Sequence, residues 1–429
     1  MTRAGSLLGA ATVALVALPT AALAGEGRFS TDVAVTAGYS HNPFTLSDGS
    51  TDSAVVSLDV LPRYQWLTER STTTLSGAVS LQQYLRRYPF TDNYSAAVDH
   101  SQRLSERVTA HGRVDLSSTV LGGFNSYLPV ASPTTPVGTA PGVGAILPGT
   151  TTGTATGTVV ATPIASSFPA LTDIGLFGTR SRRQLARFSG DLSASLSARD
   201  SLTGSAFFEA ARYNRALLAA DYEGYGGSLG YSRRVSDRWT VGLRGSGSHF
   251  NYRGRDSDST VYSLEGTFSG RLSAVWSVDG SLGASFVDSG AVGSTRRTSV
   301  SGSVNVCRRG ERSLMCAQLS RQVAPTGLVG TQYVTAAGLN WSTRLSEREN
   351  LSLSANYSKI GSDRTALLLG AQRLRTEFVQ AVAGYDRQLR ERLRFVASAN
   401  YRQLLSGGPG RVSDYGGQVG LSYRFGDPR

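Results

Sequence analysis

Apolar and polar side chains alternate along most of this chain, from residue 29 to residue 425. Successive residues of a β-strand point to opposite faces, so the alternation predicts strands with one apolar and one polar face. An apolar face on strand after strand indicates a sheet whose outer surface meets lipid. In the stretch 268–286 the lipid-facing residues are expected to be Phe268, Gly270, Leu272, Trp276, Val278, Leu282 and Phe286.

The alternation predicts 18 strands and hence a single transmembrane antiparallel up-and-down β-barrel, with both termini of the chain on the periplasmic side. Sixteen strands is the competing count, because 201–213 and 332–345 are the least regular segments. The strands are predicted at 29–39, 54–66, 72–85, 93–104, 107–120, 183–198, 201–213, 222–235, 238–252, 259–273, 275–288, 296–308, 313–324, 332–345, 350–360, 376–389, 392–404 and 415–425.

A short phrase of the form Leu-Ser-Glu-Arg recurs where two alternating segments meet. A repeat at strand junctions predicts one type of hairpin turn used again and again around the barrel. Tryptophan, tyrosine and phenylalanine near these junctions predict an aromatic girdle on the short-turn side, at Trp66, Trp239, Trp276, Tyr423 and Phe425. The phrase stands at 66–70, 103–107, 234–238, 344–348 and 388–392, with looser copies at 196–200 and 271–275.

Residues 1–24 predict a cleaved secretory signal peptide, with Arg3, an apolar run at 7–18 and a small-residue site ending at Ala24. We therefore expect one domain, an outer-membrane barrel formed by residues 25–429 of a Gram-negative protein. Outer-membrane lipid and the barrel assembly machinery are the expected partners.

The composition agrees with a barrel and excludes other classes. Charged residues make up 17% of the chain, below the roughly 25% usual for soluble domains. No interior run approaches the roughly 20 apolar residues of a membrane helix, which excludes a helical membrane protein. The net charge of +12 is scattered and the chain carries an export signal, so nucleic-acid binding is not expected.

The C-terminal strand carries Gln418, Gly420, Tyr423 and Phe425 in a pattern that resembles the signal read by the outer-membrane assembly machinery. That resemblance implies that these four residues serve assembly. The signal usually ends a chain, whereas residues 426–429 follow it here.

The two cysteines flank one predicted turn. If Glu311 and Arg312 are the central turn residues, Cys307 lies opposite Cys316 and both point inward. An exported protein meets oxidising conditions, so we predict a cross-strand disulfide, with free thiols as the alternative.

Residues 116–172 contain no charged residue, and half of the 14 prolines lie in this stretch. Proline lacks the N–H that a strand ladder needs, so the stretch is predicted to be a long loop, on the extracellular side. It either lies on the surface or folds inward as a constriction or plug.

Several arginines fall on the inward phase of their strands, and they suggest an anionic solute or polymer in the lumen. The alternative is that arginine merely replaces lysine throughout, since the chain has 42 arginines and only Lys359. Arg212 and Arg321 are exceptions that fall on the lipid-facing phase. The inward candidates are Arg63, Arg113, Arg187, Arg244, Arg271, Arg394, Arg402 and Arg424, with His111 beside Arg113, and the acids Asp59, Asp115, Asp191, Glu209 and Glu265.

Enzymatic signals are weak. The four histidines show no metal-ligand spacing, and no nucleophile elbow or phosphate-binding loop occurs in a suitable context. We expect no enzyme activity, no catalytic residues, no metal and no cofactor.

The opening strand, from Asp32 to Phe44, resembles the start of the β-barrel porin type 2 family, and the Leu-Ser-Glu-Arg turns look like that group too. The resemblance implies a role in moving exopolysaccharide through the outer membrane, with an anionic polysaccharide and periplasmic export components as partners. Two hypotheses follow from the sequence: a polysaccharide-export barrel, and alternatively a general diffusion porin for small anionic solutes.

Overall fold

The computed structural model describes residues 26–46, 52–86, 88–123, 173–174, 176–177, 179–214, 219–253, 258–289, 295–327, 330–361, 376–406 and 411–426. The predicted signal peptide lies outside the described residues, and so does 124–172 of the uncharged stretch. Residues 116–120 of that stretch belong to a strand, so the loop begins later than the sequence suggested.

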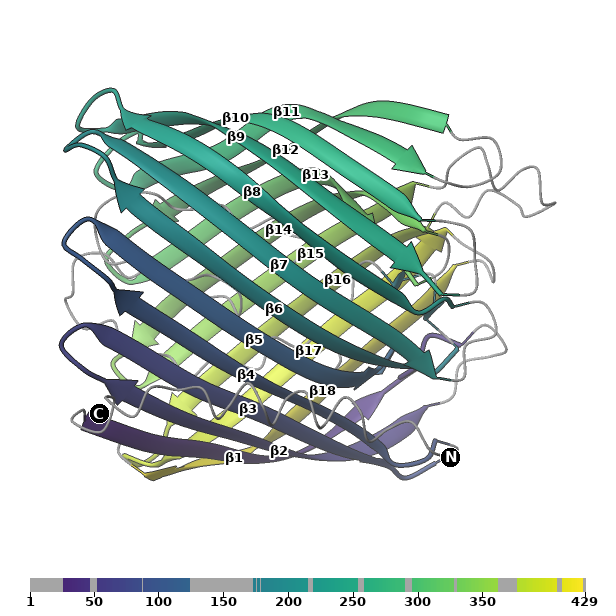
Figure 1. Ribbon diagram of the computed structural model, residues 1–429. Coiled ribbons are helices and arrows are strands. Elements are labelled where there is room, and N and C mark those ends of the chain that lie inside the picture. Colours follow the sequence, from purple (N-terminus) through teal and green to yellow (C-terminus); the bar gives the residue numbers. More distant parts are fainter. Residues whose placement is uncertain are drawn as a thin grey trace.

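The chain forms one closed barrel of 18 antiparallel strands, each paired with its neighbours in the chain (Figure 1). The barrel closes where the first strand pairs with the last. The prediction of 18 strands is confirmed and the count of 16 is wrong. The strands are β1(Glu26–Ser40), β2(Ser53–Leu67), β3(Ser71–Tyr84), β4(Thr91–Arg103), β5(Val108–Val120), β6(Arg182–Ser195), β7(Asp200–Asn214), β8(Tyr222–Arg234), β9(Trp239–Tyr252), β10(Ser259–Arg271), β11(Trp276–Ser289), β12(Thr295–Arg309), β13(Ser313–Pro325), β14(Thr331–Ser346), β15(Glu349–Gly361), β16(Thr376–Gln388), β17(Leu393–Ser406) and β18(Val412–Gly426).

The two rims of the barrel differ. One rim, here called the turn side, carries short turns such as 104–107, and the opposite rim, the loop side, carries the longer connections (Figure 1). Glu26 pairs with Leu67 beside a short turn, and Gly426 pairs with Ser30 near that same rim. The first strand therefore begins, and the last one ends, on the turn side, as predicted.

Serine explains the repeated turn phrase. In the turn after β4, the backbone N–H groups of Leu104 and Ser105 both donate to the carbonyl of Val108, at 2.9 and 3.2 Å. The Ser105 hydroxyl accepts the N–H of Arg107 at 3.3 Å, which satisfies a donor that the strand ladder leaves free. The same backbone bonds recur in the turns 196–200, 235–239, 272–276 and 389–393.

Neighbouring turns are also bonded to one another around the rim. The carbonyl of Arg107, the last residue of its turn, accepts the N–H of Ser195 at 2.8 Å on the next hairpin. Equivalent bonds run from Arg103 to Arg70, Arg234 to Arg199, Arg271 to Arg238, Arg309 to Val275, Arg344 to Arg312, Gln388 to Arg348 and Arg424 to Arg392.

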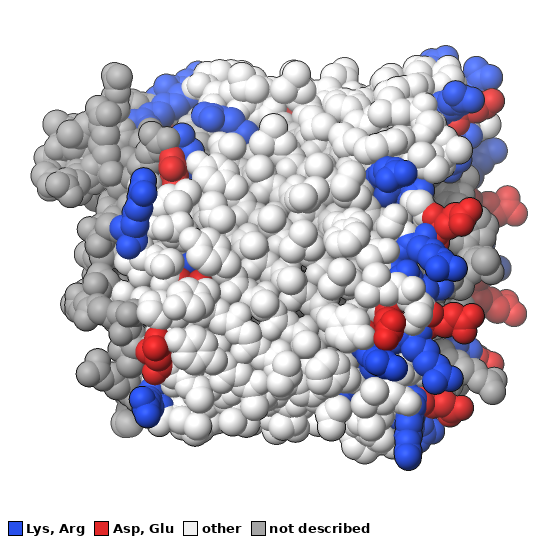
Figure 2. Space-filling model, turned by 180° about the vertical axis from the view of Figure 1, so that it is seen from behind, with Lys and Arg blue, Asp and Glu red and all other residues white. Residues whose placement is uncertain are grey.

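On the face seen in Figure 2, the outer surface is a largely uncharged band with charged side chains towards both rims. Leu264 and Leu282 point outward and are 61% and 66% exposed. An apolar belt flanked by polar rims is the surface that a transmembrane barrel presents to lipid. Tyr423 and Phe425 are exposed and pack edge to face at the turn side, where the girdle was predicted. No helix in the described part of the chain is long and apolar enough to cross a membrane.

Close approach of β1 and β18 closes the barrel. A side chain at Gly420 would place its Cβ only 2.1 Å from the carbonyl oxygen of Val35, so only glycine fits there. Beside it, the hydroxyl of Thr36 donates to the side-chain oxygen of Gln418 at 3.1 Å. Two members of the predicted assembly signal thus lie at the closing seam.

Candidate functional site

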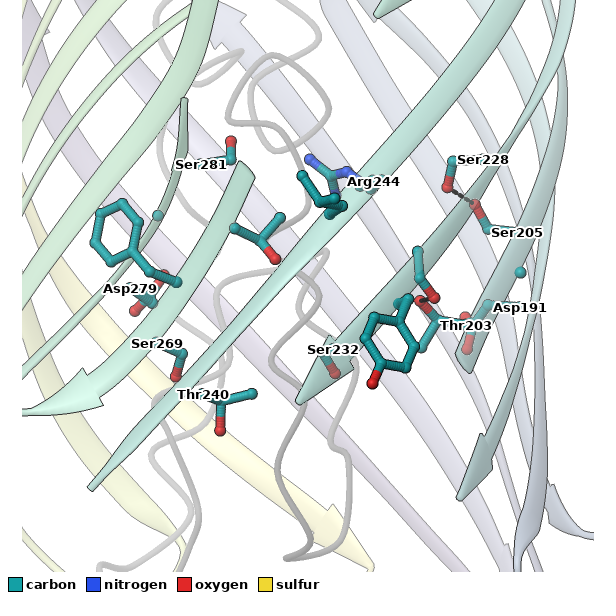
Figure 3. Close-up of a pocket in the computed structure, with 17 residues that line it drawn as sticks. Asp191, Thr203, Ser205, Ser228, Ser232, Thr240, Arg244, Ser269, Asp279 and Ser281 are labelled. Carbon is teal, nitrogen blue, oxygen red and sulfur yellow. Dashed lines mark hydrogen bonds between the residues drawn. The ribbon is translucent and has the colours of Figure 1, made fainter. Parts of the chain in front are cut away.

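The inner wall of the barrel is lined mainly by small polar side chains. Figure 3 shows this for β6 to β11, where hydroxyl groups dominate and the Ser205 and Ser228 hydroxyls are hydrogen-bonded at 2.8 Å. Such a wall is polar but carries little charge. Labelled lining residues are Asp191, Thr203, Ser205, Ser228, Ser232, Thr240, Arg244, Ser269, Asp279 and Ser281.

Charged side chains in the lumen are largely paired with each other. Arg244 on β9 bonds Glu265 on β10 at 2.8 Å, and Arg113 holds Asp115 through both Nε and Nη2. Each pair cancels most of its own field at a distance. The predicted inward placement of these arginines is correct, but pairing leaves less free positive charge than their number suggests.

A charged cluster on β4, β5 and β6 surrounds His111. Its Nδ1 lies 3.1 Å from an Asp191 oxygen, and its Nε2 lies 3.0 Å from an Asp99 oxygen. Arg113 is 3.7 Å from the same Asp99 carboxylate. Ionised carboxylates only accept hydrogen bonds, so both contacts are satisfied when both ring nitrogens of His111 carry a proton.

Arg402 ties inward-folded segments to the wall at the loop side. Its Nε bonds Asp414 at 2.8 Å, and its two terminal nitrogens donate to the carbonyls of Gly123, at 2.9 Å, and Pro43, at 2.6 Å. Asp414 also accepts the N–H of Asn42 at 2.9 Å. Because the Arg402 side chain is only 1% exposed, it is not presented to a solute, unlike the free lumen arginine that the sequence suggested.

Asp173 is a second buried centre at the loop side. Its carboxylate accepts the Tyr213 hydroxyl at 2.8 Å and the N–H of Gly327 at 2.9 Å, and lies 3.3 Å from Nε of Arg183. These partners come from β7, the β13–β14 connection and β6. Asp173 therefore fixes connections from separate parts of the rim to one another.

The segment after Asp173 crosses the lumen. Ile174 and Phe177 form one buried apolar cluster with Phe378 on β16 and Leu404 on β17, yet the chain then continues directly into β6. In an 18-strand ring, β16 lies nearly opposite β6. Residues 174 and 177 thus fold inward and narrow the loop-side opening. Whether residues 124–172 lie on the surface or fold inward stays a prediction, because they lie outside the described residues.

The turn-side opening carries a ring of arginines on the inward phase. They occupy the residue directly before each turn, where the rim bonds described above hold the backbone, and we name them the mouth arginines: Arg103, Arg234, Arg271, Arg309 and Arg344. Arg103, Arg234, Arg271 and Arg344 form no ion pair with any other described residue.

Sequence reasoning had singled out only one mouth arginine, Arg271. The signal that would have found the others is their fixed place, immediately before the repeated turn phrase. Arg394, the second residue of β17, lies beside this rim, and Arg63 lies deeper on β2. Neither forms an ion pair with a described residue. Arg187 faces Asp115 and Glu209 on the neighbouring strands and lies over the Phe207 ring. Arg424 is paired with Asp32 through two bonds of 2.8 and 2.9 Å.

Cys307 and Cys316 lie directly opposite each other on β12 and β13, with their Cα atoms 4.1 Å apart, and are joined by a disulfide. Both side chains are on the inward phase near the turn side. No group of histidine, cysteine and acidic residues in the described part of the chain is arranged to hold a metal ion.

No protein-family model matches the chain. No curated protein matches it either. Among solved structures, Pseudomonas aeruginosa OprD is similar over 94% of this chain and 97% of its own, at 11% identity and a TM-score of 0.41. Pseudomonas aeruginosa OccK2 in complex with glucuronate covers 94% and 98%, at 11% and 0.43. The siderophore receptor PirA of the same organism covers 93% and 80%, at 12% and 0.40.

Proposed function

We propose that this protein is an outer-membrane diffusion channel for small anionic solutes. The observation that carries the proposal is that four mouth arginines, Arg103, Arg234, Arg271 and Arg344, form no ion pair with another described residue. Arg113 and Arg244, deeper in the lumen, are both paired. Guanidinium groups at a confined opening raise the local concentration of carboxylates and phosphates and can bind them bidentately. A lumen lined with hydroxyl groups then offers a polar, weakly binding path.

The loop-side geometry favours small solutes over polymers. The segments bonded to Asp173 and Arg402 fold across the opening, so an extended polysaccharide would have to displace them. The exopolysaccharide-export role expected from the sequence has no specific support in the described residues. We therefore favour the diffusion channel over polysaccharide export as the function of this protein.

The location in the outer membrane belongs to the same proposal. An uncharged outer band, the predicted export signal at 1–24 and the assembly-signal pattern that includes Tyr423 and Phe425 support it. We infer that the turn side faces the periplasm and the loop side faces outward, because short periplasmic turns are usual in such barrels.

Conductance across planar bilayers tests the proposal. With purified protein and a tenfold KCl gradient, the reversal potential should show preference for chloride, and small carboxylates should carry current. An acidic polysaccharide added to either side should neither block nor pass. Cation preference, or block by the polymer at low concentration, would contradict the proposed function.

A further inference from the structure

The wall of the barrel is open between β12 and β13 on the loop side. The ladder between these strands ends at the pair Gly302 and Arg321, although β12 reaches back to Thr295 and β13 runs on to Pro325. On their other sides both strands stay paired to those ends, β12 with β11 and β13 with β14. The unpaired edge therefore belongs to this one seam.

The loop-side tip of the β13–β14 hairpin has moved to the inside of the wall. Val323 and Tyr333 are on the outward phase, yet they pack against a buried cluster that contains inward-facing residues of β7 to β11, such as Phe250 and Val261. The tip is held there by the bond from the N–H of Gly327 to Asp173. The hairpin tip thus lies on the lumen side of the edge of β12. The gap between the tip and β12 faces the lipid.

The loop-side part of β12 has a free strand edge at which a polar ligand could bind. Residues 295–301 of β12 have no ladder partner on β13. Backbone N–H and C=O groups that meet hydrocarbon are costly, so a polar partner is favoured at such an edge.

The side chains at this opening are cationic. Arg321, the arginine that falls on the lipid-facing phase in the sequence, lies where the β12–β13 ladder ends. Its guanidinium donates to the Ser299 hydroxyl at 3.4 Å and lies 5.7 Å from the centre of the Tyr333 ring. The Tyr333 hydroxyl is buried without a hydrogen-bond partner. Arg296 is exposed on the outward phase of β12, with Asp288 opposite it on β11. Figure 2 shows positive side chains reaching from the loop-side rim into the uncharged band.

We propose that the opening between β12 and β13 binds the phosphorylated head group of a glycolipid in the outer leaflet. Arg321 is the central ligand, because arginine in a lipid-facing position is costly unless an anion or water meets it. The exposed N–H groups of β12 supply further donors to phosphate oxygens. Positive charge on both sides of the gap favours this occupant over a peptide strand, which needs backbone pairing but no arginine.

The proposal uses the membrane orientation inferred above but not the transport role. Its test is binding of lipid A carrying two phosphates to detergent-solubilised protein, followed by native mass spectrometry. We expect a bound lipid A on the wild type, about tenfold weaker binding in Arg321→Gln, as expected for loss of a charge-assisted contact, and little binding of dephosphorylated lipid A. Inorganic phosphate alone should not compete at millimolar concentration, since it lacks the acyl chains.

Arg212→Gln is the matched control, because Arg212 also lies on the outward phase of β7, away from the seam. Equal loss of lipid A in both variants, or no loss in Arg321→Gln, would overturn the proposal. A bound peptide in place of lipid would overturn it as well. The conductance of Arg321→Gln is measured as well. If it is as anion-selective as the wild type, a negative lipid A result counts against the lipid site and not against the channel role.

The opening itself has an independent test. Continued pairing would place Val300 opposite Val323, so the double variant Val300→Cys/Val323→Cys would then oxidise spontaneously beside the native disulfide. We expect both introduced thiols to be alkylated by maleimide instead. Quantitative cross-linking without added oxidant would show a closed seam and remove the basis of the lipid site.

Discussion

Arg402 and Asp414 face each other across β17 and β18 and form an ion pair from which water is almost completely excluded. The remaining donors of Arg402 reach backbone carbonyls of two connections, at Pro43 and Gly123. One side chain therefore joins the wall of the barrel to the segments that narrow its loop side. Stability and the width of the opening depend on the same contact.

Replacing Arg402 with methionine should lower stability and enlarge the opening. Loss of one partner leaves the Asp414 carboxylate buried without its cation, which costs about 3–5 kcal/mol. We expect a lower unfolding temperature in detergent and a higher single-channel conductance. Arg424→Met breaks a more exposed pair on the turn side and serves as the control. A destabilised Arg402→Met protein with wild-type conductance would disprove the link to the opening.

Asp173→Asn should release the segment that crosses the lumen. An amide removes the negative charge that lies 3.3 Å from Nε of Arg183. It also replaces one of the two oxygens that accept from the Tyr213 hydroxyl and the Gly327 N–H, so the charge-assisted contacts are lost or weakened. Single-channel conductance should rise, with more frequent switching between levels. Asp92→Asn removes an ion pair with Arg182 on the outward phase and should leave conductance unchanged. Identical traces for both variants would contradict the assigned role of Asp173.

Removing the charge of four mouth arginines should reduce anion preference. The variant carries glutamine at positions 103, 234, 271 and 344, and its anion-to-cation permeability ratio should fall on the order of threefold at low salt. Salt screening predicts a much smaller difference at 1 M KCl, where the Debye length is about 3 Å. Reversal potentials at two salt concentrations measure both effects.

The matched control for the mouth arginines changes the same number of charges at the turn tips, at Arg107, Arg199, Arg238 and Arg348. These residues end their turns and are exposed. A selectivity loss as large in the control as in the mouth variant would mean that net charge, and not the inward ring, sets the preference.

The Cys307→Ser/Cys316→Ser protein should fold and conduct like the wild type but unfold more readily. The disulfide closes a short hairpin, for which chain-entropy arguments give about 2–3 kcal/mol. Denaturant unfolding in detergent with and without reductant measures the difference. A change in selectivity would be unexpected, and it would assign the cystine a role in the solute path.

Gly420→Leu should block closure of the barrel, because its side chain would overlap the Val35 carbonyl. Unclosed barrels lose the heat-modifiable shift on gels, which is the readout. Gly112→Leu is the control, since a Cβ at Gly112 would meet no atom within 4 Å. Normal closure of the Gly420 variant would show that β1 and β18 separate more easily than their geometry suggests.

The alternation of side chains predicted 18 strands, with 16 as the alternative, the inward or outward phase of each strand, and the shared rim of the two termini. It works because one face of every strand meets lipid, so a slip of one residue would bury polar groups in hydrocarbon. The pairing of Cys307 with Cys316 was predicted from the same periodicity and from the assumed centre of the turn between them. The two residues do lie opposite each other.

Contacts between distant connections could not be predicted in this way. Nothing in the local pattern distinguishes Arg402, which is buried, from Arg394, which lies near the turn-side rim, since both are inward on β17. Periodicity also assumes that each ladder runs the full strand. It therefore flagged Arg321 as an exception without showing that the wall opens beside it.

The bonded turns of the turn-side rim have an evolutionary consequence. Most hairpins carry a variant of the Leu-Ser-Glu-Arg turn and meet the neighbouring hairpin through the same N–H to carbonyl bond, as Ser195 meets Arg107. Duplication or loss of one hairpin within a gene would preserve every such junction and change only the circumference. Barrels of different bore can descend from one another through this unit without inventing new turn chemistry.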